Sequence, residues 1–401
     1  MKKIVIMTIV LLLISFINVR ALDLDIYSNN AILYNTKEDN VIYEKNAHEK
    51  VSIASLTKIT TAIVAIENIK DLDKEVTLTS DDFKGLIEAN AATAGFSVGE
   101  KVTYRDLLYG LLLPSGADAA QALERNVAGS NEEFIKLMNK KAKDLKLENT
   151  HYTNPTGLDD KEHYSTVNDV LTVFKYALNN KDFKEIITTS KYTTSNKRLT
   201  FRSTISRVSN LGLDYIKGGK TGTTGDAGLC LATLANYDNT DFILVTAKAE
   251  YSKTTPKQFL DHKKIYEYIR DNYDYKEVVN TKDVLVTLPT KYLKEDTIKL
   301  TSNKNIKLYL NNNFNKKDLS YKYSGEKIIT SRMKKNDTIG KVKVYYNNKY
   351  LTTVNITLKE EPKLYIPKLL WAYKHIFLII ILIGIFINYK KSSKKAKKNR
   401  R

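Results

Sequence analysis

Hydrophobic and polar positions follow two periods along the first two thirds of the chain. Apolar residues recur at the spacing of an amphipathic helix at residues 56–69, 104–113, 132–145 and 167–178. Strand-like runs lie at residues 31–35, 41–44, 228–235 and 242–249. A polar turn at residues 36–40 joins the first two runs into a predicted hairpin. Because strands and helices do not alternate regularly, the pattern favours an α+β fold, an antiparallel sheet with packed helices.

The helical period is absent between residues 276 and 361. Alternating segments separated by Asn- and Lys-rich turns lie there at residues 284–288, 306–310, 342–346 and 353–358. This alternation is typical of strands. The sequence therefore predicts a mixed domain over residues 22–275 and a small all-β domain over residues 276–362.

The N-terminal hydrophobic run has the layout of a secretory signal peptide. Lysines occupy positions 2 and 3, an apolar run follows, and Val19-Arg20-Ala21 offers a small-residue cleavage site. We therefore predict a signal peptide over residues 1–21. An uncleaved anchor is the alternative, because arginine is an unusual neighbour for such a site.

The C-terminal hydrophobic run predicts a transmembrane helix over residues 366–389. Its uncharged part extends from Ile376 to Ile387, and Lys374 with His375 interrupts the roughly 20 apolar residues that a span needs. Positively charged residues beside a span are retained inside the cell. Residues 390–401 are therefore predicted to be a cytoplasmic tail, with the folded domains on the extracytoplasmic face of the cell membrane.

Composition excludes several classes of function. The formal net charge is +19, but eight positive charges lie in the last twelve residues and the other lysines are scattered. This distribution lacks the compact basic stripe of a nucleic-acid-binding protein, so no nucleic-acid partner is expected. The single cysteine, Cys230, cannot form an intramolecular disulfide, and no two histidines have metal-ligand spacing. No metal and no cofactor are predicted.

Ser55-Leu-Thr-Lys58, at the start of the first predicted helix, is the first candidate for chemistry. Residues three apart on a helix face the same side, with Cβ atoms roughly 5–6 Å apart. A serine hydroxyl needs an adjacent base to become a nucleophile. A lysine becomes such a base when burial and the positive end of a helix lower its pKa. Ser-x-x-Lys recurs three times near the C-terminus, but there it does not open an apolar helix.

Two later motifs give this pair a context. Ser115 follows Leu111-Leu-Leu-Pro on a turn between apolar segments, and Lys220-Thr221-Gly222 precedes the strand-like run at 228–235. Ser-x-x-Lys, a serine turn about 60 residues later and then Lys-Thr-Gly form the ordered set of the penicillin-recognising serine enzymes. Together the three motifs are far more specific than any one of them.

The chain resembles the D-alanyl-D-alanine carboxypeptidases, the low-molecular-mass penicillin-binding proteins, over about residues 22–275. Besides the three motifs, the matching stretches are Val41-Ile-Tyr-Glu-Lys-Asn-Ala, Leu107-Leu-Tyr-Gly-Leu, Thr153-Asn-Pro-Thr-Gly-Leu and His163-Tyr-Ser-Thr. The resemblance implies the penicillin-binding/β-lactamase-like transpeptidase fold. The following β domain also fits the architecture of this family.

The resemblance implies a serine acyl-transfer reaction. Ser55 would attack the carbonyl between the two terminal D-alanines of a peptidoglycan pentapeptide stem, and water would hydrolyse the resulting acyl-enzyme. Lys58 would accept the hydroxyl proton, and Ser115 would relay it toward the leaving amine. β-Lactam antibiotics would acylate the same serine and act as covalent inhibitors.

The resemblance also implies how the substrate is held. Lys220 would attract the terminal carboxylate of the peptide, with the hydroxyl groups of Thr221 and Thr223 nearby. The oxyanion would rest on the backbone N–H groups of Ser55 and Thr223. Losing one such donor costs about 3 kcal/mol of transition-state stabilisation in other enzymes.

The sequence departs from this family in three places and leaves alternatives open. Ala117 stands where the family usually has an asparagine that would bridge the catalytic lysine and the substrate, and Ile53 stands where it usually has a proline. The anchor is a hydrophobic span, where an amphipathic helix is common. The alternatives are a catalytically weak cell-wall-binding homologue and an endopeptidase or transpeptidase on the same scaffold. A β-lactamase is disfavoured because a Glu-x-x-Leu-Asn loop after Ser115 is missing.

Overall fold

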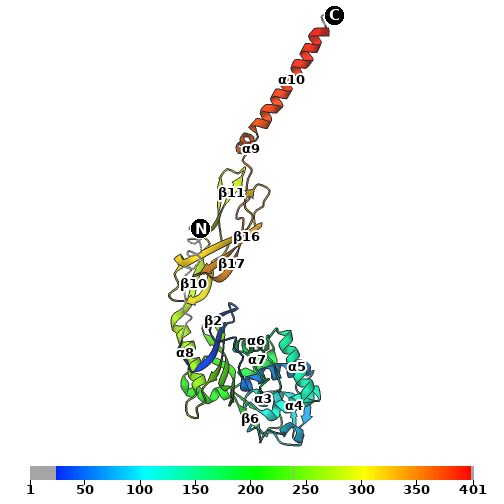
Figure 1. The fold of residues 1–401 in the computed structure, drawn as a ribbon, viewed down its shortest axis with the longest axis vertical. Helices are drawn as coiled ribbons and strands as arrows, with labels where there is room; N and C mark the ends of the chain where they lie inside the picture. The colour runs from blue at the N-terminus through cyan, green and yellow to red at the C-terminus, as the bar shows by residue number, and fades with distance from the viewer. Residues whose placement is uncertain (1–23, 238, 399–401) are drawn as a thin grey trace, which may run out of the picture. The chain divides into compact units, whose positions relative to one another are not determined.

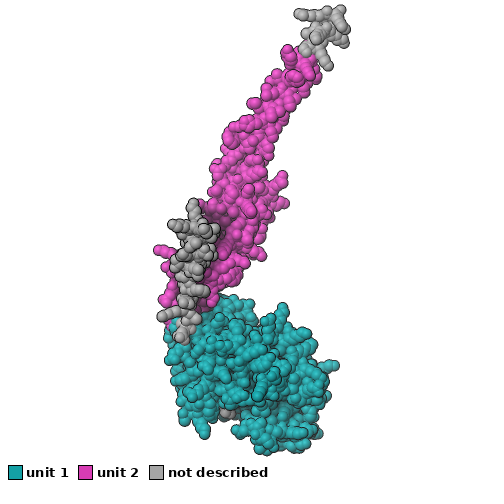
Figure 2. All heavy atoms as spheres, in the orientation of Figure 1, with its two compact units in different colours: residues 1–271 teal, residues 272–401 magenta. Residues whose placement is uncertain are grey.

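The computed structural model describes residues 24–237 and 239–398, which form two compact units. The first unit ends at Asp271 and the second begins at Asn272 (Figures 1 and 2). The predicted signal peptide, residues 1–21, lies outside the described residues.

A five-stranded antiparallel sheet with the order β2-β1-β9-β8-β7 forms the centre of the first unit. Its strands are β1 (Ser28–Asn35), β2 (Asn40–Lys45), β7 (Ile216–Thr224), β8 (Gly228–Tyr237) and β9 (Thr240–Ala249). β1 and β2 form the hairpin expected from the sequence, and β7 lies at one edge of the sheet. The prediction of an α+β fold on an antiparallel sheet is confirmed.

Seven α-helices surround this sheet (Figure 1). They are α2 (Thr57–Asn68), α3 (Tyr104–Leu112), α4 (Ala117–Ala128), α5 (Asn131–Asp144), α6 (Val167–Ala177), α7 (Lys181–Thr188) and α8 (Lys257–Asn272). The helical periodicity had indicated α2, α3, α5 and α6. It had not indicated α4, α7 and α8, of which α7 has only eight residues.

Short elements complete the first unit. They are the 3₁₀ turns η1 (Ala54–Leu56), η2 (Ser80–Phe83) and η3 (Thr204–Leu211), and the strands β3 (Glu75–Thr77), β4 (Lys101–Thr103), β5 (Lys191–Thr193) and β6 (Thr200–Arg202). β3 pairs with β4 and β5 pairs with β6, so each pair forms a small two-stranded antiparallel sheet outside the main sheet.

The two faces of the main sheet pack against different helices. On one face, Cys230, Ala232 and Leu234 of β8 belong to the large core that also contains the apolar residues of α2 to α7. On the other face, α8 packs against Leu231 through Phe259. Burial raises the pKa of the Cys230 thiol to about 12.

Helix α2 lies inside this core. Every residue from Thr57 to Ile66 is buried, so the helix has almost no solvent-exposed face. A helix that is apolar nearly all round belongs in the interior of a protein. The consequence for function is that Lys58, in the first turn of α2, is carried into the interior with it.

The second unit is the small all-β domain expected from the sequence, followed by two helices. Its strands are β10 (Tyr273–Val279), β11 (Val284–Lys291), β12 (Thr297–Thr301), β13 (Ile306–Asn311), β14 (Leu319–Gly325), β15 (Ile329–Thr330), β16 (Thr338–Tyr346) and β17 (Lys349–Thr357), with the turn η4 (Lys316–Asp318). They form the sheets β10-β13, β12-β11-β15 and β14-β16-β17. Their buried aliphatic side chains form a core of their own.

Two helices, α9 (Ile366–Ala372) and α10 (Lys374–Lys398), end the described chain. The sequence had predicted one helix over residues 366–389, but α9 ends at Ala372, and the next residue, Tyr373, interrupts the helical backbone with a φ of −102° and a ψ of 8°. Among the described residues, one helical segment, Lys374–Ser392, is long and apolar enough to cross a membrane, with a mean hydropathy of 1.5. Its apolar side chains are exposed.

Candidate active site

Ser55 and Lys58 lie together at the entrance to the buried helix α2. The Lys58 Nζ atom is 3.1 Å from Ser55 Oγ and 2.9 Å from the carbonyl oxygen of Thr156. Lys58 is only 2% exposed, whereas Ser55 is half-buried and faces a cleft. The 3₁₀ turn η1 and the first turn of α2 therefore give the hydroxyl–amine contact that the sequence spacing predicted.

The burial of Lys58 changes its acid–base chemistry. Removal from water lowers the pKa of the ammonium from 10.5 to about 7, and the Asp118 carboxylate acts in the opposite direction. Near neutral pH, a large fraction of the molecules therefore carries an uncharged amine next to Ser55. An uncharged amine can accept the hydroxyl proton and make the serine a nucleophile.

The backbone around Ser55 is tightly enclosed by two glycines. Gly157 has a φ of +80°, and a Cβ atom placed on it would lie 2.0 Å from the carbonyl oxygen of Ala54. A Cβ atom on Gly222 would lie 3.0 Å from the backbone nitrogen of Ser55. Ala54 itself has a φ of 47°, which is unfavourable for a residue with a Cβ atom. The nucleophile is therefore held from two sides in a strained turn.

Ser115 and Lys220 form a second hydroxyl–ammonium pair. Lys220, in the middle of β7, donates from Nζ to Ser115 Oγ at 2.8 Å and to the carbonyl oxygen of Thr221 at 2.7 Å. Lys220 is fully buried, and Ser115 lies with a φ of 70° in the turn before α4. Thr221 Oγ1 donates to Thr204 Oγ1 at 3.0 Å, and Thr223 Oγ1 donates to the carbonyl oxygen of Gly222 at 2.8 Å.

The Lys-Thr-Gly motif precedes the strand at residues 228–235, as expected, and itself lies in a strand. Lys220, Thr221 and Gly222 belong to β7, which pairs antiparallel with β8. Gly222 is opposite Cys230 in this pairing. The glycine-rich composition of β7 hid the strand from propensity arguments, because glycine is depleted in strands.

A cleft of about 720 Å³ opens beside the nucleophile. Ser55, Lys58, Ala117 and Thr223 are among the residues that line it. A neighbouring pocket of about 610 Å³ shares Thr223 and is also lined by Thr204, Thr221 and Lys253. Ser115 and Lys220 are buried, and neither is among the residues that line these two pockets.

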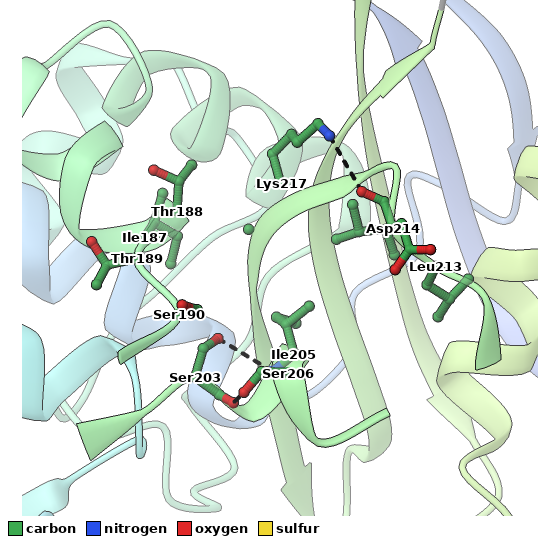
Figure 3. Close-up of a pocket in the computed structure, with 12 residues that line it drawn as sticks. Ile187, Thr188, Thr189, Ser190, Ser203, Ile205, Ser206, Leu213, Asp214 and Lys217 are labelled. Atoms are coloured by element: carbon green, nitrogen blue, oxygen red, sulfur yellow. Dashed lines mark hydrogen bonds between the residues drawn. The ribbon is translucent and has the colours of Figure 1, made fainter. Parts of the chain in front are cut away.

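A separate hollow of about 230 Å³ lies at the beginning of β7 (Figure 3). Its polar groups bond to one another. Lys217 Nζ donates to the carbonyl oxygen of Asp214 at 3.2 Å, and Ser206 Oγ donates to that of Ser203 at 2.6 Å. The site residues predicted from the sequence are not among those that line this hollow.

Asp118 is a residue of the site that the sequence analysis did not identify. Its buried carboxylate accepts backbone N–H groups from Ala94 at 2.7 Å, Gly95 at 3.1 Å and Phe96 at 3.2 Å. It thus fastens one wall of the cleft to the beginning of α4. An aspartate in the first turn of a helix indicates capping of that helix. It gives no indication of the long-range contact with residues 94–96.

Asn154 and His163 organise the wall that holds Lys58. Asn154 Oδ1 accepts the N–H groups of Thr156 at 3.1 Å and Gly157 at 2.7 Å. His163 lies 2.8 Å from Thr57 Oγ1, and burial lowers the pKa of its imidazole to about 4. His163 is therefore uncharged at neutral pH and serves as a hydrogen-bonding partner within the wall.

Comparison with known proteins gives two family matches. The D-alanyl-D-alanine carboxypeptidase family, peptidase S11, matches residues 17–251. The C-terminal domain of penicillin-binding protein 5 matches residues 273–363.

Similar curated proteins are carboxypeptidases and endopeptidases. D-alanyl-D-alanine carboxypeptidase DacF of Bacillus subtilis is 34% identical over 239 residues, which cover 58% of this chain and 59% of the relative. DacC of Escherichia coli is 37% identical over 229 residues, covering 55% and 56%. A D-alanyl-D-alanine endopeptidase of Pseudomonas aeruginosa is 29% identical, covering 57% and 74%. The matches to DacF and DacC thus span less than two thirds of those relatives.

Similar solved structures come from the same group of proteins. The Streptomyces K15 DD-transpeptidase is 30% identical, with a TM-score of 0.57, and the match covers 61% of this chain and 98% of that one. Penicillin-binding protein 5 of Haemophilus influenzae is 20% identical, with a TM-score of 0.64, and the match covers 84% and 98%. At this low identity, the second comparison supports the fold alone.

Proposed function

Because the chain belongs to the D-alanyl-D-alanine carboxypeptidase family of serine peptidases, we propose that it removes the terminal D-alanine from peptidoglycan stem peptides. The observation that carries this proposal is the 3.1 Å contact between the buried Lys58 amine and the Ser55 hydroxyl at the cleft. A lysine with a pKa of about 7 can work as a general base at neutral pH.

In the proposed acylation step, Ser55 Oγ attacks the carbonyl carbon between the last two D-alanines. Lys58 takes the hydroxyl proton as the new C–O bond forms. The C–N bond then breaks, and the proton passes through Ser115 to the leaving amine of D-alanine. The positive end of η1 and α2 lies at Ser55, which favours the negative charge that develops on the substrate oxygen.

Substrate binding is assigned to β7. The buried charge of Lys220 would attract the terminal carboxylate of the peptide, and the hydroxyl groups of Thr221 and Thr223 would donate to it. The backbone N–H groups of Ser55 and Thr223 would hold the oxyanion. The short distance between Gly222 and the Ser55 nitrogen supports this assignment, because it puts β7 directly beside the nucleophile.

Water then hydrolyses the ester and regenerates Ser55. A β-lactam would acylate the same hydroxyl group, and its ring-opened product would stay on the enzyme. The partners of this protein would thus be pentapeptide stems as substrates and β-lactams as covalent inhibitors.

We further propose a membrane-anchored arrangement. The signal peptide, residues 1–21, would send residues 22–275 and 276–362 to the extracytoplasmic side, and the helix within residues 366–389 would hold the protein in the cell membrane. The apolar exposed surface of Lys374–Ser392 supports this anchor. The basic residues 390–401 would then remain in the cytoplasm.

An endopeptidase is the second candidate function. D-alanyl-D-alanine endopeptidases of Pseudomonas aeruginosa and Escherichia coli match this chain at 29% and 28% identity. The chemistry at Ser55 would be the same, and the substrate would be a cross-linked peptide instead of a free pentapeptide stem. A catalytically weak cell-wall-binding homologue is favoured only by Ala117.

The decisive experiment measures D-alanine released from a pentapeptide together with covalent labelling by penicillin. We expect both in the wild type, with a long-lived adduct on Ser55. Ser55→Ala should abolish both, and Lys58→Ala should lower kcat by about 10²–10⁴-fold, the usual contribution of general acid–base catalysis.

A matched control is available in the second unit. Ser324 and Lys327 have the same spacing as Ser55 and Lys58, so Ser324→Ala and Lys327→Ala should leave both readouts unchanged. A wild type that binds pentapeptide but releases no D-alanine would establish the binding homologue. Cleavage of cross-linked dimers alone would establish the endopeptidase, and rapid turnover of penicillin would establish a β-lactamase.

A further inference from the structure

Position 117 lacks a side chain that this active-site architecture usually carries. Ala117, the first residue of α4, is 1% exposed and lines the catalytic cleft with a methyl group. An asparagine at this position would have offered an amide N–H donor and a carbonyl acceptor to the substrate. The peptide backbone of a bound substrate has the complementary groups.

We propose that Asn90 supplies to the substrate the carboxamide that position 117 lacks. The proposal rests on the proposed function, because the ligand is the backbone amide of the acyl part of the peptide. Asn90 lines the cleft together with Ser55, Gly157 and Thr223, and among the described residues it is the only carboxamide that does so.

The backbone brings this wall to position 117. The Ala117 N–H group donates to the carbonyl oxygen of Ala92 at 2.7 Å, so the chain two residues after Asn90 is bonded directly to the position that lacks the amide. Ala91 N donates to the carbonyl oxygen of Leu86 at 2.9 Å, which closes the turn on which Asn90 lies. The two positions therefore belong to one connected piece of the cleft.

The side chain of Asn90 is available to a ligand. It is exposed, and within the described parts of the chain it has no hydrogen bond to another protein group. Its neighbours in this wall are Ala89, Ala91 and Ala92, which offer no polar side-chain atoms. A carboxamide is thus the single polar side chain on an otherwise methyl-lined surface.

The wall that carries Asn90 is also held in place. The Asp118 carboxylate accepts the backbone N–H groups of Ala94, Gly95 and Phe96, which fastens the segment to α4 beside Ser115. A side chain on a fastened segment loses less conformational entropy on binding than one on a free loop. Asn90 therefore has the placement required of a substrate-binding residue.

The local conformation gives a competing structural reason for an asparagine. Asn90 has a φ of 47°, and asparagine tolerates this left-handed region better than most residues. The test must therefore remove the carboxamide and keep the turn. Asn90→Gly does both, because glycine adopts positive φ without strain.

The experiment is a double-mutant cycle on the full chain, read as kcat/KM for D-alanine release and as the second-order rate of Ser55 labelling by a penicillin with an amide side chain. We expect Asn90→Gly to lower both by about tenfold, the effect of one lost hydrogen bond to the ligand. In the Ala117→Asn background, the same substitution should cost less than about twofold, because the amide at 117 replaces the one at 90.

Asn347 provides a matched control. It lies in the β16–β17 turn of the second unit with a φ of 48°, so Asn347→Gly makes the same chemical change in the same conformation away from the cleft. It should leave both rates unchanged.

Two outcomes would overturn the inference. In the first, Asn90→Gly leaves both rates unchanged. In the second, Asn90→Gly lowers the rates equally whether residue 117 is alanine or asparagine. A wild type that is labelled by penicillin but releases no D-alanine would overturn only the carboxypeptidase function. The rates of penicillin labelling in the wild type, Asn90→Gly, Ala117→Asn and the double variant would then still test whether Asn90 contacts the ligand.

Discussion

Burial determines the chemistry of the two lysines at this site. Lys58 is taken into the core by the apolar helix α2, and the loss of hydration lowers its pKa to about 7. Lys220 is equally buried and, like Lys58, contacts one serine hydroxyl group and one carbonyl oxygen, those of Ser115 and Thr221. Lys58 is therefore suited to accept a proton from Ser55, and Lys220 is proposed to hold the carboxylate of the substrate.

The pKa of Lys58 leads to an expectation for the pH dependence of the reaction. Protonation of Lys58 removes the base, so kcat/KM for pentapeptide should fall as the pH drops through about 7. The negative charge of Asp118 raises this pKa. Asp118→Asn should therefore move the acid limb of the kcat/KM profile to lower pH, in addition to any loss in rate from the loosened wall.

In Asp118→Asn, the pH midpoint of the acid limb distinguishes the loss of the negative charge from a structural defect. A purely structural defect would lower the whole profile and leave its midpoint in place. Asp182→Asn, at an exposed carboxylate that pairs with Arg105, is the control and should not move the midpoint. A midpoint that stays fixed or rises in Asp118→Asn would contradict the expectation.

The spacing of residues in the sequence predicted the contact between Ser55 and Lys58 but not the groups that surround this pair. Ser55 and Lys58 were visible because three-residue spacing on a helix is a local relation. The Lys58–Thr156 bond and the three N–H groups that converge on Asp118 join residues more than twenty positions apart. Such contacts depend on the tertiary fold, which hydrophobic periodicity does not encode.

At the scale of elements, the strained turn before α2 is packed between two other segments. Ala54 has a φ of 47°, and the close approach of Gly157 to its carbonyl oxygen leaves no room for a side chain. The Thr153-Asn-Pro-Thr-Gly-Leu loop thereby positions both Lys58, through the carbonyl oxygen of Thr156, and the backbone of the nucleophile.

Gly157→Ala should therefore damage both stability and catalysis. The positive φ costs about 1–2 kcal/mol, and overpacking against Ala54 adds about 1–3 kcal/mol to the loss in unfolding free energy. A displacement of Ser55 by about 1 Å should lower kcat/KM by about 10²-fold. Denaturant unfolding and the rate of penicillin labelling measure the two effects.

Gly129→Ala is the matched control for this substitution. Gly129 has the same φ of +80° at the end of α4, but an added Cβ atom meets nothing within 4 Å. It should cost about 1–2 kcal/mol of stability and leave the labelling rate unchanged. If Gly157→Ala and Gly129→Ala changed the unfolding free energy and the labelling rate equally, the contact of residue 157 with Ala54 would contribute to neither.

Strand β7, which the hydrophobic pattern did not indicate, owes its composition to tertiary packing. Strand β7 reads Ile-Lys-Gly-Gly-Lys-Thr-Gly-Thr-Thr, a composition that intrinsic strand propensity disfavours. A Cβ atom on Gly218 would lie 2.3 Å from the carbonyl oxygen of Ile187, so tertiary packing requires a glycine where local propensity would prefer a larger residue. Helices α2 and α6 were predictable because their own apolar residues form the core.

At the scale of the whole molecule, the two units have separate hydrophobic cores. The first contains the sheet and the helices around the cleft, and the second is formed by the strands of the β domain. All of the candidate catalytic residues belong to the first unit, while the apolar helix α10 belongs to the second. The proposed chemistry and the proposed anchoring therefore depend on different parts of the chain.

Removal of the C-terminal helices should separate these two properties. A chain that ends at Tyr365 lacks α9, α10 and the basic tail but keeps both cores. We expect it to move from the membrane fraction to the soluble fraction, with penicillin labelling of Ser55 unchanged. A truncated protein that remains in washed membranes would show that another segment, such as an uncleaved N-terminal run, provides the anchor.

The buried position of Cys230 has a practical consequence. This residue is the only cysteine in the chain, it lies in β8 without solvent exposure, and its thiol stays protonated at neutral pH. Alkylating reagents, which require an accessible thiolate, should therefore leave the native protein unmodified. A cysteine introduced at the exposed Tyr251, on the rim of the cleft, would then be the sole attachment point for a fluorophore that reports ligand occupancy in real time.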